Sequence, residues 1–292
     1  MRFNFLKNSW QILVKSFNHF IDFNGLKLSA ALSYYTVFSI APLLIVITSL
    51  SGLFFGQLAV EGKVYSQISG LVGSDTALQI QDIIRNTQLS SHGKLGGIIG
   101  TIVLLIGASG VFSEIQSSIN YLWAIPAPMK KAFLFALLRK LISFSLLIGF
   151  AFIFLVSLTA NAVLDILSDR LKGLFSDSLI KLFYFVNLAL IVLVISAMFM
   201  LIFKILPNSS ISWKHAFIGA VVTSVLFLFG KFIIGFYLGH SLIGATYGTT
   251  ASIVILMLWI YYSSIILYFG ACYTAVYADF RGHPIRVRGS AS

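Results

Sequence analysis

Residues 179–206 read LIKLFYFVNLALIVLVISAMFMLIFKIL, an apolar run broken by Lys181, Asn187, Ser196 and Lys204. A transmembrane helix needs about 20 consecutive, mostly apolar residues, so this run is long enough to cross a bilayer. Five other stretches have the same character: residues 28–56, 95–113, 141–164, 215–239 and 249–278. The sequence therefore predicts an all-α fold, a polytopic membrane helical bundle with six transmembrane helices.

The composition supports a membrane protein over a soluble one. Of the 292 residues, 58% are hydrophobic and 10% are charged, and the mean hydropathy is +0.95. Soluble domains carry about 25% charged residues, because their surface must be covered by groups that water solvates. The single cysteine, Cys272, excludes an intramolecular disulfide and a cysteine-based metal cluster.

The segment before the first expected span, residues 1–27, predicts an amphipathic helix. It is too polar to span the bilayer, so we expect it to lie in the membrane interface with Lys7 and Lys15 near lipid headgroups. An ordinary helix packed on the cytoplasmic ends of the bundle is the alternative. Residues 28–278 would form the transmembrane domain, and residues 279–292 a short basic cytoplasmic tail. In the segment 1–27 the apolar residues recur every three to four positions: Phe3, Leu6, Trp10, Leu13, Val14, Phe17 and Ile21.

The basic residues predict the orientation of the chain. Lys and Arg number 20 against 9 Asp and Glu, a net charge of +11. In the six-span topology thirteen of the basic residues fall on the side of both termini and six on the opposite side. Cytoplasmic loops carry the excess of Lys and Arg, so both termini are expected in the cytoplasm. The basic residues form no compact cluster in the sequence, so we expect anionic lipid headgroups at the cytoplasmic face as partners and no nucleic acid.

Polar side chains inside the expected spans are the candidate site, because lipid offers them no hydrogen-bond partners. Two interpretations remain open. The residues could line a substrate path in a polar cavity open to the cytoplasm, or they could fasten helices by interhelical hydrogen bonds of about 0.6–2 kcal/mol each. The uncharged candidates are Ser29, Ser33, Thr36, Ser109, Ser113, Gln116, Asn120, Tyr261, Tyr262 and Tyr268.

Two ionisable residues lie nearest to the hydrocarbon, Glu114 and Lys231. Such residues mark functional sites in membrane proteins. Lys231 is expected near the outer face, where its long side chain could instead extend to the headgroups. Glu114 is either an interfacial residue or an acid of the cavity.

Motifs for catalysis or for a cofactor are absent from the sequence, so we expect neither an enzyme nor a bound cofactor. There is no nucleotide-binding G-x-x-x-x-G-K-[ST], no H-E-x-x-H and no G-x-S-x-G. The five histidines match no metal-ligand spacing. Glycine pairs four residues apart, such as Gly235 and Gly239, permit close helix packing within one chain or between the copies of a homo-oligomer.

Three stretches carry a resemblance to a known family. Residues 28–56 read LSAALSYYTVFSIAPLLIVITSLSGLFFG, residues 107–123 read GASGVFSEIQSSINYLW, and residues 206–278 include GKFIIGFYLG, YGTTASIVILMLWIYYS and YFGACYTAVYA. In these the chain resembles the YihY/BrkB family of bacterial inner-membrane proteins, once called ribonuclease BN-like. The resemblance implies six spans in the bacterial cytoplasmic membrane. It also implies a glutamate where this chain has Cys272.

The old ribonuclease label does not fit the residues. Metal-dependent RNA hydrolysis needs clustered carboxylates, and only Asp22, Glu114 and Asp279 are expected on the cytoplasmic side. We therefore predict a transporter or lipid flippase-like protein with an anionic or amphipathic substrate. The alternative is a non-transporting membrane scaffold or envelope-associated interaction protein.

Overall fold

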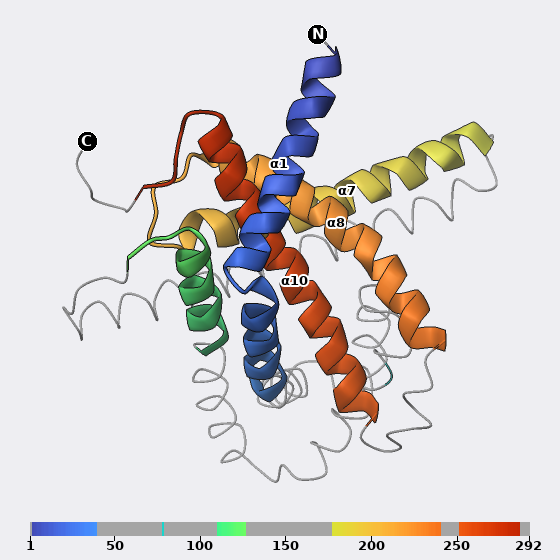
Figure 1. Ribbon diagram of the computed structural model, residues 1–292. Coiled ribbons are helices and arrows are strands. Elements are labelled where there is room, and N and C mark those ends of the chain that lie inside the picture. Colours follow the sequence, from blue (N-terminus) through green and yellow to red (C-terminus); the bar gives the residue numbers. More distant parts are fainter. Residues whose placement is uncertain (1, 40–77, 79–109, 127–176, 241–250, 287–292) are drawn as a thin grey trace, which may run out of the picture. The chain divides into compact units, whose positions relative to one another are not determined.

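The computed structural model describes residues 2–39, 78, 110–126, 177–240 and 251–286 (Figure 1). These residues are helical throughout their regular parts and contain no β-strand, which confirms the all-α prediction for the described part of the chain. The helices are α1 (Arg2–Asp22), residues 25–39, residues 110–122, α7 (Asp177–Ile205), α8 (Trp213–His240) and α10 (Ala251–Phe280).

Three of the helices are long and apolar enough to cross a membrane. Their apolar windows are Leu188–Ile205, Trp213–Ile234 and Val254–Phe280, with mean hydropathies of 2.8, 2.2 and 1.8. The helices α7, α8 and α10 hold 29, 28 and 30 residues. At about 1.5 Å per residue each exceeds the roughly 30 Å of a hydrocarbon core, so each can cross with a tilt.

The ends of these three helices lie within two residues of the predicted spans 179–206, 215–239 and 249–278. Of the predicted spans 28–56 and 95–113, the described parts, residues 28–39 and 110–113, are helical. The predicted span 141–164 and the end of the basic tail lie outside the described residues.

The chain divides into two compact units. Unit 1 comprises Met1–Phe23, Ile119–Leu228 and Phe269–Ser292, and unit 2 comprises Asn24–Ser118 and Phe229–Tyr268. The helices α8 and α10 are each divided between the two units, α8 after Leu228 and α10 after Tyr268.

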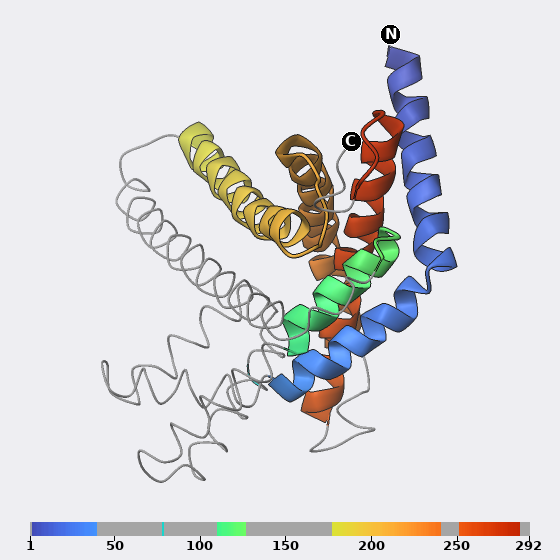
Figure 2. The same ribbon diagram turned by 90° about the vertical axis from the view of Figure 1, so that its left-hand side faces the viewer.

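Helix α1 belongs to unit 1 and runs beside the C-terminal part of α10 (Figures 1 and 2). Ile12, Ser16 and Phe20 are buried on its inner face, and the ring of Phe20 lies 6.3 Å from that of Phe269. The apolar residues expected on one face are therefore split, because only part of them packs against the unit. The large apolar side chains that stay exposed recur along the helix: Trp10, Val14, Phe17 and Ile21.

The helices α8 and α10 pack closely in unit 1 through two matched glycine–threonine pairs. A Cβ atom added at Gly219 would lie 2.8 Å from the Cβ of Thr274, and one added at Gly270 would lie 2.9 Å from the Cβ of Thr223. Each threonine hydroxyl donates to the carbonyl of the glycine four residues before it, at 2.7 Å in both helices. The hydroxyls are thus satisfied inside their own helices, and the glycines let the two backbones approach each other.

Helix α7 joins the same unit by contacts of a different kind. The hydroxyls of Ser196 and Ser224 form a buried hydrogen bond of 2.6 Å between α7 and α8. One turn further along, the rings of Phe199 and Phe227 lie 6.1 Å apart in an edge arrangement. The Ser224 hydroxyl also bonds the carbonyls of Ala220 and Val221 within α8. Sliding either helix would therefore cost the bond between the helices and leave the buried Ser196 hydroxyl without this partner.

Candidate functional site

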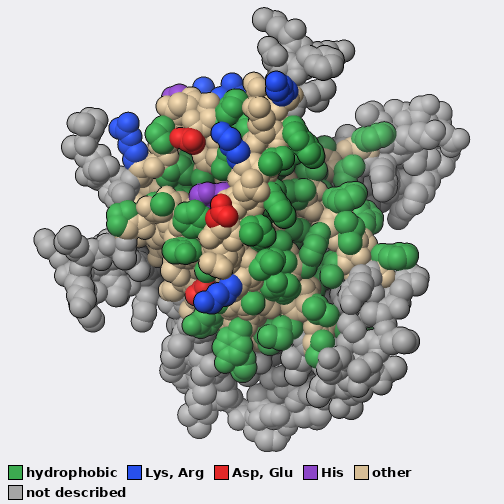
Figure 3. All heavy atoms as spheres, in the orientation of Figure 1, with side chains coloured by type: hydrophobic (Ala, Val, Ile, Leu, Met, Phe, Trp, Pro, Cys, Tyr) green, Lys and Arg blue, Asp and Glu red, His purple; other side chains and the backbone are tan. Residues whose placement is uncertain are grey.

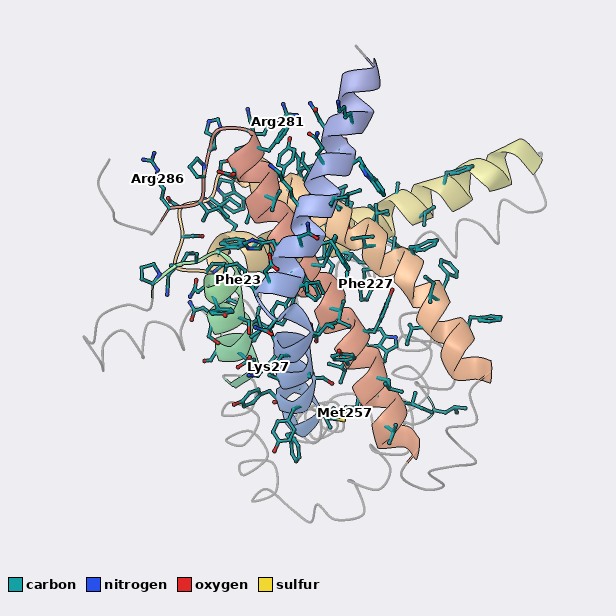
Figure 4. The ribbon with its side chains drawn as sticks, in the orientation of Figure 1. Phe23, Lys27, Phe227, Met257, Arg281 and Arg286 are labelled. Atoms are coloured by element: carbon teal, nitrogen blue, oxygen red, sulfur yellow. The ribbon has the colours of Figure 1, made fainter. Side chains whose placement is uncertain are left out.

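Three helical segments meet in unit 2: residues 25–39, the helix that begins at residue 110, and the first part of α10. The Ser33 hydroxyl donates to the carbonyl of Met257 at 2.9 Å and joins residues 25–39 to α10 (Figure 4). A Cβ atom added at Gly110 would lie 3.9 Å from Cδ1 of Tyr35, an ordinary contact between the first two segments. These are parts of the three helices that carry most of the polar candidates.

The most polar contact among these segments involves Glu114, Ser118 and Tyr268, which we call the tyrosine–carboxylate cluster. The Ser118 hydroxyl donates to Oε1 of Glu114 at 3.1 Å, one turn away on the same helix. Tyr268 is fully buried on α10. Its hydroxyl lies close to Ser118 but meets hydrogen-bond geometry with no described group.

The depth of this cluster follows from helix geometry. Tyr268 precedes the end of α10 at Phe280 by twelve residues, which is about 18 Å along the helix axis. Glu114 is only half-buried. Chemically, the cluster offers one carboxylate and one uncommitted O–H donor, that of Tyr268, for a polar group of a ligand, because the Ser118 hydroxyl already donates to Glu114.

The other polar candidates on the first helix use their own backbone. Ser29 donates to the carbonyl of Gly25 and Thr36 to that of Leu32, both at 2.8 Å. Bonds of this kind satisfy a hydroxyl without leaving it available to a ligand.

The candidates on residues 110–122 do not share one environment. Ser113 is exposed and Gln116 is buried. Asn120, in unit 1, accepts a hydrogen bond of 2.9 Å at its side-chain oxygen from the backbone N–H of Asn208. Ser109 lies outside the described residues. The predicted stripe on this helix is therefore not a single inward face over the residues described.

The remaining candidates lie on α8 and α10 in unit 2. Tyr262 packs against the backbone of α8, since a Cβ atom added at Gly230 would lie 2.5 Å from its Cζ. Tyr261 and Lys231 are each partly exposed. Tyr262 is thus a packing residue, and Gly230 on the facing helix makes room for its ring.

Sequence reasoning missed the glycine–threonine pairs between α8 and α10. The signal was available, because glycine and threonine four residues apart form a small-x-x-x-small pattern typical of close membrane helices. It also missed Trp123, whose Nε1 donates to the carbonyl of Ala271 at 2.9 Å in a buried contact. That partnership joins residues 148 positions apart, and no local pattern indicates it. Among the described residues, no group of three or more His, Cys, Asp or Glu side chains could hold a metal ion.

Comparison with known proteins identifies the family. A family model described as "Virulence factor BrkB" matches residues 16–289, nearly the whole chain. The chain belongs to the BrkB family. The resemblance found in the sequence is thereby confirmed, and this BrkB family member is a membrane protein with transmembrane helices.

Its relatives are named as membrane proteins. A "UPF0761 membrane protein" of Stenotrophomonas maltophilia is 27% identical over 282 residues, which cover 93% of this chain and 62% of the relative. A protein of the same name from Psychromonas ingrahamii is 28% identical, covering 85% of this chain and 81% of the relative. One from Pseudomonas aeruginosa is 27% identical, covering 83% and 57%. The BrkB family member described here thus spans about three fifths of the length of the Stenotrophomonas and Pseudomonas relatives. No solved structure matches the chain.

Proposed function

We propose that this BrkB family member moves a small amphipathic, lipid-like substrate across the bacterial cytoplasmic membrane, and that the tyrosine–carboxylate cluster lies on the substrate's path. The observation that carries the proposal is the buried Tyr268 hydroxyl, which has no hydrogen-bond partner among the described residues. It lies beside Ser118, and Ser118 is bonded to the half-buried Glu114.

The physical argument rests on the energy of unpaired polar groups. A buried hydroxyl without a partner costs about 1–3 kcal/mol, and in hydrocarbon neither lipid nor bulk water supplies the missing bond. A polar headgroup atom passing the cluster would supply it. Ionisable residues at such depth are typical of substrate or proton pathways, and Glu114 supplies the titratable group.

We also propose that both chain termini lie in the cytoplasm and that the substrate is anionic or amphipathic. The distribution of Lys and Arg supports the orientation. The cluster contributes a carboxylate and no cation, so attraction of an anionic substrate would come from basic residues at the cytoplasmic face.

The test measures lipid movement in vesicles that contain the purified full chain. Phosphatidylglycerol carrying a fluorophore is placed in both leaflets, and dithionite quenches the outer leaflet. We expect Tyr268→Phe to slow the second, movement-limited phase at least tenfold while the protein unfolds at an unchanged or higher temperature, because the change removes only the unpaired hydroxyl. Tyr273→Phe, a buried tyrosine of α10 outside the cluster, is the matched control. Equal rates for the wild type, Tyr268→Phe and protein-free vesicles would refute the proposal.

A non-transporting scaffold is the second candidate, and the satisfied polar residues favour it. Ser33 donates to a carbonyl of another helix, which is what a residue that fastens helices would do. Ser29 and Thr36 donate to carbonyls of their own helix, so their hydroxyls are not available to a substrate. The scaffold predicts that Ser33→Ala lowers the unfolding temperature with no lipid movement to lose. The transporter predicts that Ser33→Ala leaves movement measurable, because Ser33 is not in the cluster.

A further inference from the structure

Basic and aromatic side chains converge at one end of unit 1, where α8 begins and α10 ends. The set comprises Lys214, His215, Tyr277, Arg281, His283 and Arg286, and we call it the cationic end cluster. Figure 3 shows Lys and Arg side chains gathered around the end of α10, whereas hydrophobic side chains cover α8. Figure 4 shows Arg281 at the end of α10 and Arg286 on the segment that follows it.

The centre of the cluster is a group of three rings in tilted and edge contact, with a guanidinium group over one of them. The ring of His215 lies 5.2 Å from that of His283 and 5.8 Å from that of Tyr277. The Arg281 guanidinium lies over the Tyr277 ring at 5.4 Å. Nδ1 of His215 is bonded to the Ser212 hydroxyl at 2.7 Å. When this hydroxyl donates to Nδ1, the neutral imidazole carries its proton on Nε2, which remains as a donor for a ligand.

A helix-capping motif holds the second histidine in place. Gly282 has a φ of 74°. The N–H of His283 donates to the carbonyl of Ala278 at 3.0 Å, and that of Gly282 to Asp279 at 2.9 Å. These two bonds form a Schellman motif, in which glycine takes the left-handed position without steric cost. The motif turns the chain back toward α8, so that His283 meets His215.

The segment after the motif is fixed to the connection between α7 and α8. The backbone N–H of Ser210 donates to the carbonyl of Arg286 at 2.9 Å. The side chain of Arg286 is exposed. Backbone pairing of this kind places the charge of Arg286 on the same end of the unit as Lys214 and Arg281 without depending on any side-chain ion pair.

The positive charge at this end is not neutralised by the described residues. Between Lys204 and Lys214, and between Tyr277 and Arg286, the only carboxylate is Asp279. Asp279 is exposed and forms no ion pair among the described residues. Concentrated like charges destabilise one another unless an anion binds between them.

The cluster lies beside the ends of three candidate membrane spans, which is where lipid headgroups are expected. The apolar windows end at Ile205 on α7 and Phe280 on α10 and begin at Trp213 on α8, so three candidate spans share this end. Lys204 lies over the exposed Trp213 ring at 5.4 Å. Tryptophan and lysine at the ends of spans are typical of the membrane–water interface.

We propose that the cationic end cluster binds the phosphate of an anionic membrane lipid, with the Arg281 guanidinium and the His215 imidazole as the donors. His283 bonds its Nδ1 to the Arg281 carbonyl at 2.9 Å, so it donates to the phosphate only from Nε2 of its imidazolium form. Arginine presents paired N–H groups that match two phosphate oxygens. Lys214 and Arg286 add electrostatic attraction for the lipid without forming hydrogen bonds to its phosphate. The site is distinct from the tyrosine–carboxylate cluster, and it would exist in a scaffold as well as in a transporter.

The experiment titrates the purified full chain in dodecyl maltoside with short-chain dioctanoyl phosphatidylglycerol and follows tryptophan fluorescence, because Trp213 borders the cluster. Parallel titrations use dioctanoyl phosphatidylcholine and inorganic phosphate. The double variant Arg281→Gln/His283→Gln is compared with Lys15→Gln, which removes an exposed charge from α1 outside the cluster. We expect phosphatidylglycerol to bind the double variant at least tenfold more weakly, because the variant removes the guanidinium and one imidazole of the cluster.

The outcomes separate the possible ligands. Tenfold weaker binding to the double variant alone, with weak binding of phosphatidylcholine and of inorganic phosphate, supports the proposal. Inorganic phosphate that binds as tightly as phosphatidylglycerol would assign the site to a free phosphate and overturn the lipid. Equal affinity of the wild type and the double variant would overturn the site itself. Arg281→Lys should recover part of the affinity, and circular dichroism spectra of all variants should coincide.

Discussion

Substituting Gly219 by alanine should separate α8 from α10. The added Cβ would lie 2.8 Å from the Cβ of Thr274, against ordinary contacts of 3.4–4 Å, so the helices must move apart by at least 0.6 Å. Overpacking with so short a contact lies in the upper half of the usual range, at about 2–3 kcal/mol. It outweighs the gain of roughly 1 kcal/mol that alanine brings to a helix interior in place of glycine.

The sole cysteine provides the assay. Cys272 is fully buried on α10, so a maleimide reaches it only when the protein opens. A net loss of about 1–2 kcal/mol raises the alkylation rate roughly 5- to 30-fold when opening is faster than labelling.

Two further variants make the reasoning refutable. Gly110→Ala is the matched control, because its Cβ would meet only Tyr35 at 3.9 Å, and its labelling rate should stay equal or fall. Adding Thr274→Gly to Gly219→Ala exchanges the small and the large partner of the pair. Cys272 in the double variant should therefore be alkylated more slowly than if the free-energy changes of the two single variants simply added. An unchanged rate for Gly219→Ala, or an equal rise for Gly110→Ala, would show that the glycine–threonine pair does not hold the helices together.

Three further predictions use the same alkylation rate, or the temperature of unfolding, as the measurement. Ala124 has a φ of 51° at the end of residues 110–122, so Ala124→Gly should stabilise the protein by about 1 kcal/mol, and destabilisation would exclude strain there. The Ser212 hydroxyl accepts the backbone N–H of His215 at 3.3 Å, so Ser212→Ala should cost about 1 kcal/mol as the loss of a helix cap. Trp123→Phe removes the 2.9 Å bond to the Ala271 carbonyl and should cost about 1–3 kcal/mol, whereas a neutral effect would mean that the bond is not formed.

The helices with the highest hydropathy were predictable because bilayer thickness sets their length. The ends of α7, α8 and α10 follow from where polar residues resume. The division of α1 into a packed face and an exposed apolar face was not predictable. A repeat of three to four residues shows that a helix has an apolar side, but it cannot show how much of that side another helix covers.

The candidate site was predictable only as a set of polar residues. Ser33, Thr36 and Tyr268 look alike in a hydropathy profile, yet one bonds another helix, one bonds its own backbone, and the hydroxyl of the third has no described partner. Which of these occurs depends on what faces the side chain across a helix interface. That information comes from pairs distant in sequence, and a single sequence does not carry it.

The bonds between early and late parts of the chain have a consequence for biosynthesis. Ser33 donates to a carbonyl 224 residues downstream, and Trp123 donates to one 148 residues downstream. At about 5–20 residues per second, the ribosome needs on the order of 10–45 s to make Met257 after Ser33. During that interval the first helices must remain inserted without their final partner, and Ser33 has to find a temporary acceptor in its own backbone or in water. A ribosome stalled before α10 would therefore leave a chain whose amino-terminal segments are in the membrane but unassembled.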